Sequence, residues 1–319
     1  MAIKEAVFPR AWGWFFDEIL PNFVKNHYSP KESWKERPFS RTDAVFFLKG
    51  VRELSDKFTE GRDDFRAGYF QHQKFRSSYL LYFLPLQAAK FLLLMDQHKD
   101  QVRMIVEEGR KKGKLRIADV GAGPGTASLA FLLYILQHHP ENLPEIEFIW
   151  CDEAGRMMED GKELIAELCK NFRPLDGKVS IRTIIGDWKR YRFAADERFN
   201  WSLFGHVLNE GKSMHQTDRL TDTLREWVER SGAGGVLFIE PSFKASSQLL
   251  SKIRDQLVLK KEEVIPEPDE EFLDEKFARP NKKLTADLPV GVVGPCLHAG
   301  KCPMAAGKDW CHFSENTEK

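Results

Sequence analysis

From Leu115 onward, short apolar runs alternate with longer amphipathic segments, and this pattern constrains the fold of the 319-residue chain more than any other feature. Short, continuous apolar runs are typical of strands buried on both faces of a parallel sheet. Amphipathic segments between such strands are typical of the helices that cover the sheet. The pattern predicts a doubly wound, Rossmann-like α/β domain with right-handed crossovers, in which a ligand lies beyond the carboxyl ends of the strands.

The predicted elements of this domain fall within residues 113–260. The expected strands are Leu115–Val120, Ile146–Cys151, Val179–Ile185, Trp201–His206 and Gly235–Glu240, and the expected helices are Gly125–His139, Gly155–Phe172, Gln216–Ser231 and Ala245–Leu257. The functional residues are expected in the loops that lead from strand to helix.

Residues 1–112 show a helical pattern, and residues 261–319 show no regular pattern. Apolar positions recur at intervals of three and four residues in Ala11–Val24, Ala44–Phe58, Tyr79–Met95 and Val102–Arg110. This spacing predicts a helical N-terminal unit. The last part, interrupted by Pro266, Pro268 and Pro280, is expected to be a loop followed by a cysteine motif packed on the α/β domain.

Composition narrows the class of protein. With 42% hydrophobic and 30% charged residues, and no run near the ~18 apolar residues of a membrane span, the chain is expected to be a globular protein outside the membrane. Met1–Leu20 lacks the pattern of a secretory or transit peptide, which predicts a cytoplasmic location. Residues 1–114 hold 21 Lys/Arg against 15 Asp/Glu, a modest excess that permits contact with RNA but does not require it.

A glycine-rich loop follows the first predicted strand. Gly121, Gly123 and Gly125 allow a sharp turn close to a ligand, and the backbone N–H groups of the next helix start there. A dinucleotide-binding loop needs a third glycine at position 126, which holds Thr126. The spacing, preceded by Asp119, resembles the first motif of S-adenosylmethionine-dependent methyltransferases. The alternative interpretation is a plain tight turn.

Polar residues end the next two strands. Asp152 ends the second strand, where methyltransferases place an acid that accepts hydrogen bonds from the ribose hydroxyls. Asp187, after the third strand, is expected to bond the adenine amino group, and Trp188 is expected to stack on adenine or to pack against the core. Asp152 has an alternative interpretation as an ordinary strand-end aspartate.

The loop Phe204–Glu210, after the fourth strand, is expected to face the transferred methyl group. It lacks the Asn/Asp-Pro-Pro-Tyr pattern of enzymes that methylate base amino groups, and it holds no cysteine nucleophile. His206 is equally well interpreted as a base or as a strand-end histidine. Methyl transfer needs little more than an aligned acceptor, so no catalytic residue is assigned.

Three of the five cysteines lie close together near the C-terminal end. Cys296, Cys302 and Cys311 are separated by five and eight residues, with proline and glycine between them, and this spacing favours a metal centre over a disulfide framework. Structural zinc completed by His298 or His312 is an alternative, and simple burial of the cysteines is another.

Several segments together resemble the methyltransferase-like family that assembles the mitochondrial ribosomal small subunit, which has bacterial relatives. These segments are Pro295–Pro303, Trp310–Ser314, Arg76–Pro85 and Glu240-Pro241. The resemblance implies a class I methyltransferase fold with a [4Fe–4S] cluster, acting on the small ribosomal subunit at or near its rRNA. It implies Cys296, Cys302 and Cys311 as cluster ligands, and Gly121, Gly123, Gly125 and Asp152 as the wall of the S-adenosylmethionine pocket.

The sequence departs from the family pattern at its end. A fourth cysteine ligand and a final antiparallel strand have no counterpart after Cys311, so we expect either a truncated chain or a cluster closed by an oxygen, His298, His312 or a partner. Three functions are carried forward: an rRNA methyltransferase, a non-catalytic assembly factor that binds RNA and S-adenosylmethionine, and a small-molecule methyltransferase.

Overall fold

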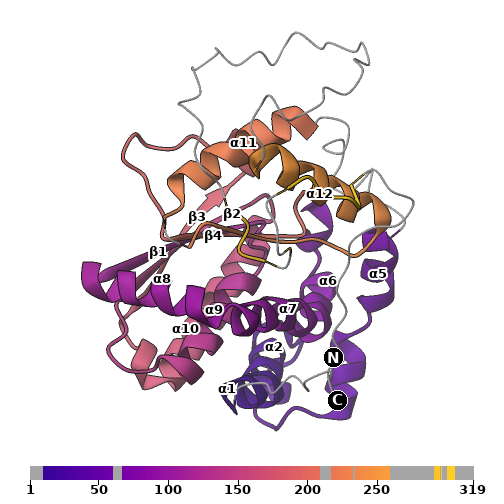
Figure 1. Ribbon diagram of the computed structural model, residues 1–319. Coiled ribbons are helices and arrows are strands. Elements are labelled where there is room, and N and C mark those ends of the chain that lie inside the picture. The colour runs from indigo at the N-terminus through magenta and orange to yellow at the C-terminus, as the bar shows by residue number, and fades with distance from the viewer. Residues whose placement is uncertain are drawn as a thin grey trace, which may run out of the picture.

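A five-stranded, fully parallel sheet forms the centre of the protein (Figure 1). The computed structural model describes residues 10–59, 67–208, 217–232, 234–258, 291–294, 296 and 300–305. The strands are β1 (Lys114–Val120), β2 (Glu145–Asp152), β3 (Val179–Ile185), β4 (Trp201–Gly205) and β5 (Val236–Ile239), in the spatial order β3-β2-β1-β4-β5. This order and the crossover helices confirm the predicted doubly wound, Rossmann-like α/β sheet.

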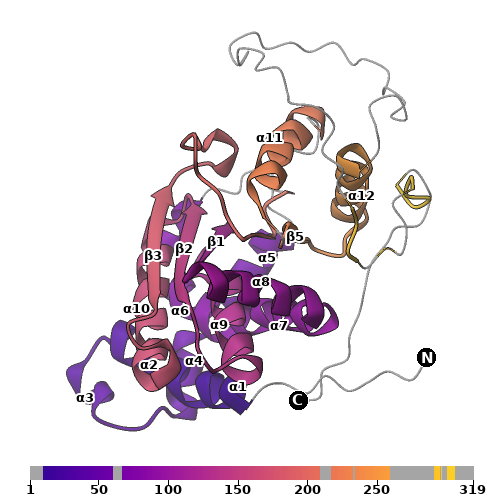
Figure 2. The ribbon, with the colours of Figure 1, turned by 60° about the vertical axis from the view of Figure 1, so that its left-hand side comes forward.

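Alternate residues of the strands face two helical layers. Ile117 and Phe148 belong to a core shared with α9 (Thr126–His138) and α10 (Gly155–Asn171). Ala118 and Ile149 face the other side, where α11 (Thr217–Arg230) and α12 (Lys244–Val258) pack. Figure 2 shows α11 and α12 on one side of the sheet and α7, α8 and α9 on the other. The central strands β1, β2 and β4 are therefore largely buried on both faces, which explains why apolar residues dominate them, whereas the edge strand β3 alternates between half-buried and exposed residues over most of its length.

The register aligns the ends of the strands. Val120 at the end of β1 pairs with Cys151 on β2 and with Phe204 on β4, and Asp152 pairs with Ile185 at the end of β3. The loops after these four strands therefore start at one edge of the sheet. The fourth and fifth strands are shorter than predicted. β4 ends at Gly205, before His206, whose backbone has a positive φ of 61°, and β5 begins after Gly235, whose φ is 60°.

The described residues of the N-terminal segment are helical, as the sequence pattern predicts. Its helices are α1 (Arg10–Trp14), α2 (Leu20–Tyr28), α3 (Glu32–Lys35), α4 (Arg41–Phe47), α5 (Val51–Thr59), α6 (Gln73–Ser78), α7 (Leu84–Gln97) and α8 (Lys99–Lys112), with π-helical turns at Phe15–Ile19 and Tyr79–Phe83 and a 3₁₀ turn at Ala67–Gln71. The first π-helical turn ends two residues before Pro21. Because proline has no backbone N–H, Pro21 cannot donate the hydrogen bond that an α-helix would form there.

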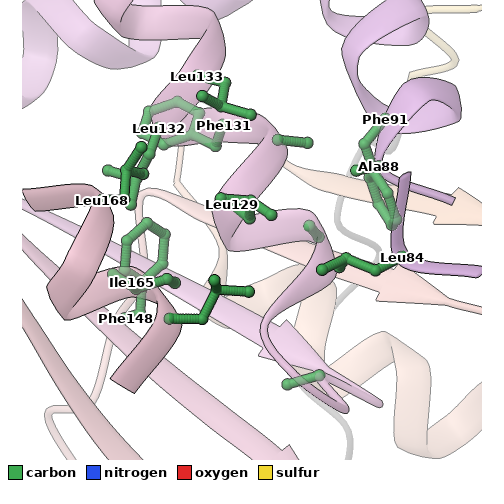
Figure 3. Close-up of a cluster of buried hydrophobic side chains, with 14 of the residues drawn as sticks. Leu84, Ala88, Phe91, Leu129, Phe131, Leu132, Leu133, Phe148, Ile165 and Leu168 are labelled. Atoms are coloured by element: carbon green, nitrogen blue, oxygen red, sulfur yellow. The ribbon is translucent and has the colours of Figure 1, made fainter. Parts of the chain in front are cut away.

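The helical unit shares its core with the sheet. Figure 3 shows Leu84 and Ala88 of α7 in the same buried cluster as Leu129 of α9 and Phe148 of β2. The boundary predicted near residue 112 thus separates two patterns of sequence but not two hydrophobic cores. The continuous helical run Gln73–Gln97 is long and apolar enough to cross a membrane by length and composition, and 44% of its most apolar window is buried in this fold.

A buried polar network joins the helical unit to α10. The carboxylate of Asp160 on α10 accepts hydrogen bonds from Tyr28 on α2 and from Arg76 Nε on α6, the latter at 2.6 Å. His27 Nε2 lies 3.1 Å from Asp160 Oδ1, and its Nδ1 lies 3.1 Å from Glu163 Oε2. Both ring nitrogens of His27 therefore face carboxylates, which favours the doubly protonated ring.

We expect the contribution of His27 to stability to depend on pH. The hydrogen bond to Asp160 raises the pKa of His27 above its ordinary 6.5, so the stabilisation is complete below pH 6.5 and is lost as pH rises through the folded-state pKa. His27→Gln should lower the free energy of unfolding by about 1–2 kcal/mol in acid and by less in alkali, measured by urea denaturation at about pH 5.5 and about pH 8.5. An equal loss at both pH values would contradict a charged His27.

Candidate active site

The glycine loop after β1 forms the floor of the candidate site. Gly121, Gly123 and Gly125 all have positive φ, at 69°, 52° and 76°. A Cβ on Gly121 would lie 1.9 Å from Val207 Cγ1, and one on Gly125 would lie 2.1 Å from the Trp150 ring. A Cβ on Gly123 would meet no atom within 4 Å. Two of the glycines thus permit close packing beneath the loop, whereas Gly123 borders open space.

Asp152 at the end of β2 fixes this loop. Its Oδ2 accepts the N–H of Gly123 at 2.8 Å, and its Oδ1 accepts the N–H of Ala154 at 2.7 Å. Each oxygen retains a further lone pair. Burial raises the pKa of this carboxyl above its usual range. A hydroxyl donor from a ligand would therefore stabilise the ionised form of Asp152.

Asp119 supports the loop from inside the fold. Its Oδ2 accepts the N–H and the hydroxyl of Ser128 at 2.9 and 2.7 Å, and the Ser128 oxygen accepts Trp150 Nε1 at 2.8 Å. This chain of hydrogen bonds holds the first turn of α9 against β1 and β2. Burial raises the pKa of Asp119 to about 6.

A pocket of about 490 Å³ opens above the loop, a volume typical of small-molecule sites. Its sheet side includes Asp119, Gly121, Gly123, Asp152 and the loop that follows β4. Its other side comes from the helical N-terminal unit and is rich in aromatic rings: Phe58, Tyr69, Phe70, Tyr79, Phe83 and Phe91. The structure therefore gathers the predicted loops at one cavity and closes it with helices.

The residues after β3 also border the pocket. Asp187 accepts the N–H of Lys189 at 3.0 Å and begins a short 3₁₀ turn. Trp188 is buried and packs edge-on against Phe204, with ring centroids 5.4 Å apart. Of the two expectations for Trp188, the structure shows packing against the core, and the residue also lines the pocket. Gly125 lies beneath the loop against Trp150 rather than on the pocket wall.

Thr126, at the start of α9, provides a direct test of whether a ligand fits. Its side-chain oxygen is buried, lines the pocket, and has no hydrogen-bond partner among the described residues. A buried hydroxyl without a partner is unfavourable, and a polar ligand atom in the pocket would satisfy it. Together with the open face of Gly123 and the two carboxylates, this hydroxyl makes the cavity suitable for a polar, partly cationic ligand such as S-adenosylmethionine.

The contribution of α7 to this site was not predicted from the sequence. Gln87 and Lys90 line the pocket from α7, and Gln87 contacts both Lys90 and His206. The resemblance of Arg76–Pro85 to family members was the only signal near them. Periodicity shows which face of a helix is apolar, but it does not show which loop that helix will cover.

The described part of the cysteine motif is anchored on α12. Both oxygens of Asp255 accept the N–H of Cys302, at 3.0 and 2.8 Å, and Arg254 Nη1 donates to the carbonyl of Gly300 at 2.5 Å. Cys302 is buried and Cys296 is half-buried. Among the described residues, no group of three or more His, Cys, Asp and Glu side chains is placed to hold a metal, and Cys311 lies outside them.

Comparison with known proteins finds one family and several solved structures. Residues 280–319 match the family model described as "Mitochondrial small ribosomal subunit Rsm22". No curated protein matches the chain. The match confirms the predicted family resemblance and falls on the segment that holds the cysteine motif.

Three solved structures are similar to this chain, with low TM-scores and low sequence identity. The YcgJ protein from Bacillus subtilis has 19% identity over 42% of this chain, with a TM-score of 0.25. An O-methyltransferase family protein from Burkholderia thailandensis has 12% identity over 65% (TM-score 0.32), and the mitomycin 7-O-methyltransferase MmcR has 15% over 76% (TM-score 0.31). The matches span 47%, 57% and 55% of those chains, respectively. The fold assignment rests on the sheet itself.

Proposed function

Given the match of residues 280–319 to the Rsm22 family, we propose that this chain binds S-adenosylmethionine in the 490 Å³ pocket and acts on the small ribosomal subunit, at or near its rRNA. The observation that carries the proposal is the position of the pocket. It lies at the carboxyl ends of β1, β2, β3 and β4, over a glycine loop whose Gly123 N–H is fixed by Asp152.

The proposed roles of the residues follow from the pocket wall. Asp152 would accept hydrogen bonds from the ribose hydroxyls, and Asp187 would accept a hydrogen bond from the adenine amino group. Thr126 would bond a polar atom of the donor, and the N–H groups at the start of α9 provide partial positive charge. When bound, S-adenosylmethionine supplies a methyl group on a positively charged sulfur. The residues of this chain orient it and exclude water, while the loop after β4 borders the acceptor.

The first test is binding of the demethylated product, S-adenosylhomocysteine, by calorimetry. Wild-type protein should bind it, and Asp152→Ala should weaken binding by about tenfold or more, because one acceptor for the ribose and the anchor of Gly123 are both removed. Asp176→Ala, in the turn after α10, serves as a matched control and should leave the affinity unchanged. Folded wild-type protein without any affinity would overturn the proposal.

Methyl transfer separates the enzyme from a non-catalytic assembly factor. Radiolabelled methyl transfer should be measured with naked rRNA and with small subunits, using Asp152→Ala as the inactive control. Label that depends on the intact site indicates an rRNA methyltransferase. Tight binding of S-adenosylmethionine without transfer of label to the RNA indicates an assembly factor. The absence of a recognisable acceptor motif in the loop after β4 favours this alternative.

We further propose that Cys296, Cys302 and Cys311 bind a [4Fe–4S] cluster, with structural zinc as the alternative. The support is the family match, which covers all three cysteines, and the anchoring of Cys302 on Asp255. Anaerobically purified protein should be brown, and Cys302→Ser should remove the visible absorbance that thiolate-bound iron produces. Cys169→Ser, a cysteine on α10, is the matched control. Colourless protein with stoichiometric zinc would refute the cluster and leave the fold intact.

A further inference from the structure

A polar cluster lies on the helical side of the pocket, at the loop that follows β4. Gln87 Oε1 on α7 lies 2.8 Å from Lys90 Nζ, one helical turn along, and 2.5 Å from Nε2 of His206. All three residues line the pocket. Two segments 119 residues apart in sequence are thus joined through a single amide oxygen.

Hydrogen-bond chemistry fixes the orientation of this cluster. The ammonium group of Lys90 can only donate, so the side chain of Gln87 must present its oxygen to it. The same oxygen then accepts from Nε2 of His206, which assigns the proton of a neutral ring to Nε2. Lys90 forms no ion pair with a carboxylate among the described residues. Its ammonium group donates one N–H to Gln87, so two N–H groups remain to bind a ligand. Lys90 remains exposed to solvent, and partial desolvation beside the pocket lowers its pKa.

The backbone of His206 supports a specific role for the cluster. Its φ of 61° lies in the left-handed region, which costs a non-glycine residue about 1 kcal/mol or more. The conformation is held by the N–H of His206, which donates to the carbonyl of Ile239 at 2.8 Å. Such strain persists at sites where the surrounding structure fixes a side chain in one position, and here it places the ring against Gln87.

We propose that Lys90, positioned by Gln87 and His206, binds an anionic oxygen of the ligand in this pocket. The charges of the two walls support this assignment. The sheet side carries the carboxylates Asp119 and Asp152, which suit a cationic group, whereas the helical side presents an ammonium group that suits an anion. Two ligands could supply the anion: the amino-acid carboxylate of the methyl donor, or a phosphate of an RNA acceptor. The inference rests on the proposed function.

The test compares two ligands that differ only in the amino-acid group. S-adenosylhomocysteine carries the carboxylate, and 5′-methylthioadenosine lacks it. If Lys90 binds the carboxylate, Lys90→Met should weaken binding of S-adenosylhomocysteine by about tenfold to a hundredfold, the usual effect of losing a charge-assisted hydrogen bond, and leave 5′-methylthioadenosine unchanged. Lys90→Arg should retain most of the affinity, and Lys99→Met, on α8, is the matched control.

A second arm measures binding of a short single-stranded RNA at several salt concentrations. If the anion is a phosphate, Lys90→Met should weaken RNA binding and lower the salt slope by about one, with no effect on S-adenosylhomocysteine. Unchanged affinity for both probes, in a variant with wild-type circular dichroism, overturns the assignment and makes the cluster a structural tie. Wild-type protein that binds neither probe overturns the proposed function as well.

Discussion

Gly125→Ala should lower the free energy of unfolding by about 3 kcal/mol, because two penalties combine at this position. The φ of 76° is unfavourable for any residue with a Cβ. The new methyl carbon would also lie 2.1 Å from the Trp150 ring, which is fully buried and hydrogen-bonded to Ser128 and therefore cannot move aside easily. Urea denaturation of the variant and the wild type measures the difference.

Two other glycines separate the contributions. Gly113→Ala, at the C-terminal end of α8, has a φ of 72° and no atom within 4 Å of the new methyl group, so it should cost only about 1 kcal/mol of backbone strain. Gly123→Ala should lower the free energy of unfolding by a similar amount. It should also weaken the binding of S-adenosylhomocysteine by about tenfold, because the new methyl group would lie beside the pocket. Equal losses of stability in all three variants would show that the ring contact at Gly125 is unimportant.

The strands and the edge that holds the site were predictable because local patterns determine them. Leu115–Val120 and Ile146–Cys151 are almost entirely buried on both faces, so apolar residues dominate both segments. Each strand then ends at a residue whose type departs from the run, such as Gly121 or Asp152. Because parallel strands end at one edge, finding the strands was sufficient to place these residues together.

The wall contributed by the helical unit could not be predicted in the same way. The side chains of Gln87 and Lys90 look like the exposed face of an amphipathic helix, and only the docking of α7 beside the loop after β4 makes them part of the pocket. Asp160 presents the same difficulty. It lies within a helix rich in charged residues, and its partners Arg76 and Tyr28 are 84 and 132 residues away in sequence.

Arg76→Met should lower the free energy of unfolding by about 3 kcal/mol or more, because it leaves the buried carboxylate of Asp160 without its guanidinium partner. Arg76 and Asp160 side chains are only 9% and 7% exposed, so water cannot replace the lost contact. The ion pair helps to hold the pKa of Asp160 below its usual range, against the effect of burial. The variant loses this contribution but keeps the hydrogen bonds from His27 and Tyr28, which also lower the pKa of Asp160. Denaturation in urea near neutral pH measures the loss of stability.

The same substitution should weaken the binding of S-adenosylhomocysteine, because Arg76 also holds the wall of the pocket. Its Nη1 donates to the carbonyls of Phe70 and Gln71 at 3.0 and 3.1 Å, and the ring of Phe70 lines the cavity. The control is Lys74→Met, which removes an exposed ion pair with Glu53 and should cost less than about 1 kcal/mol. If Arg76→Met were no more destabilising than this control, the network at Asp160 could not be what fastens the helical unit to α10. If the variant lost stability but bound the ligand normally, the aromatic wall would have to be held by packing alone.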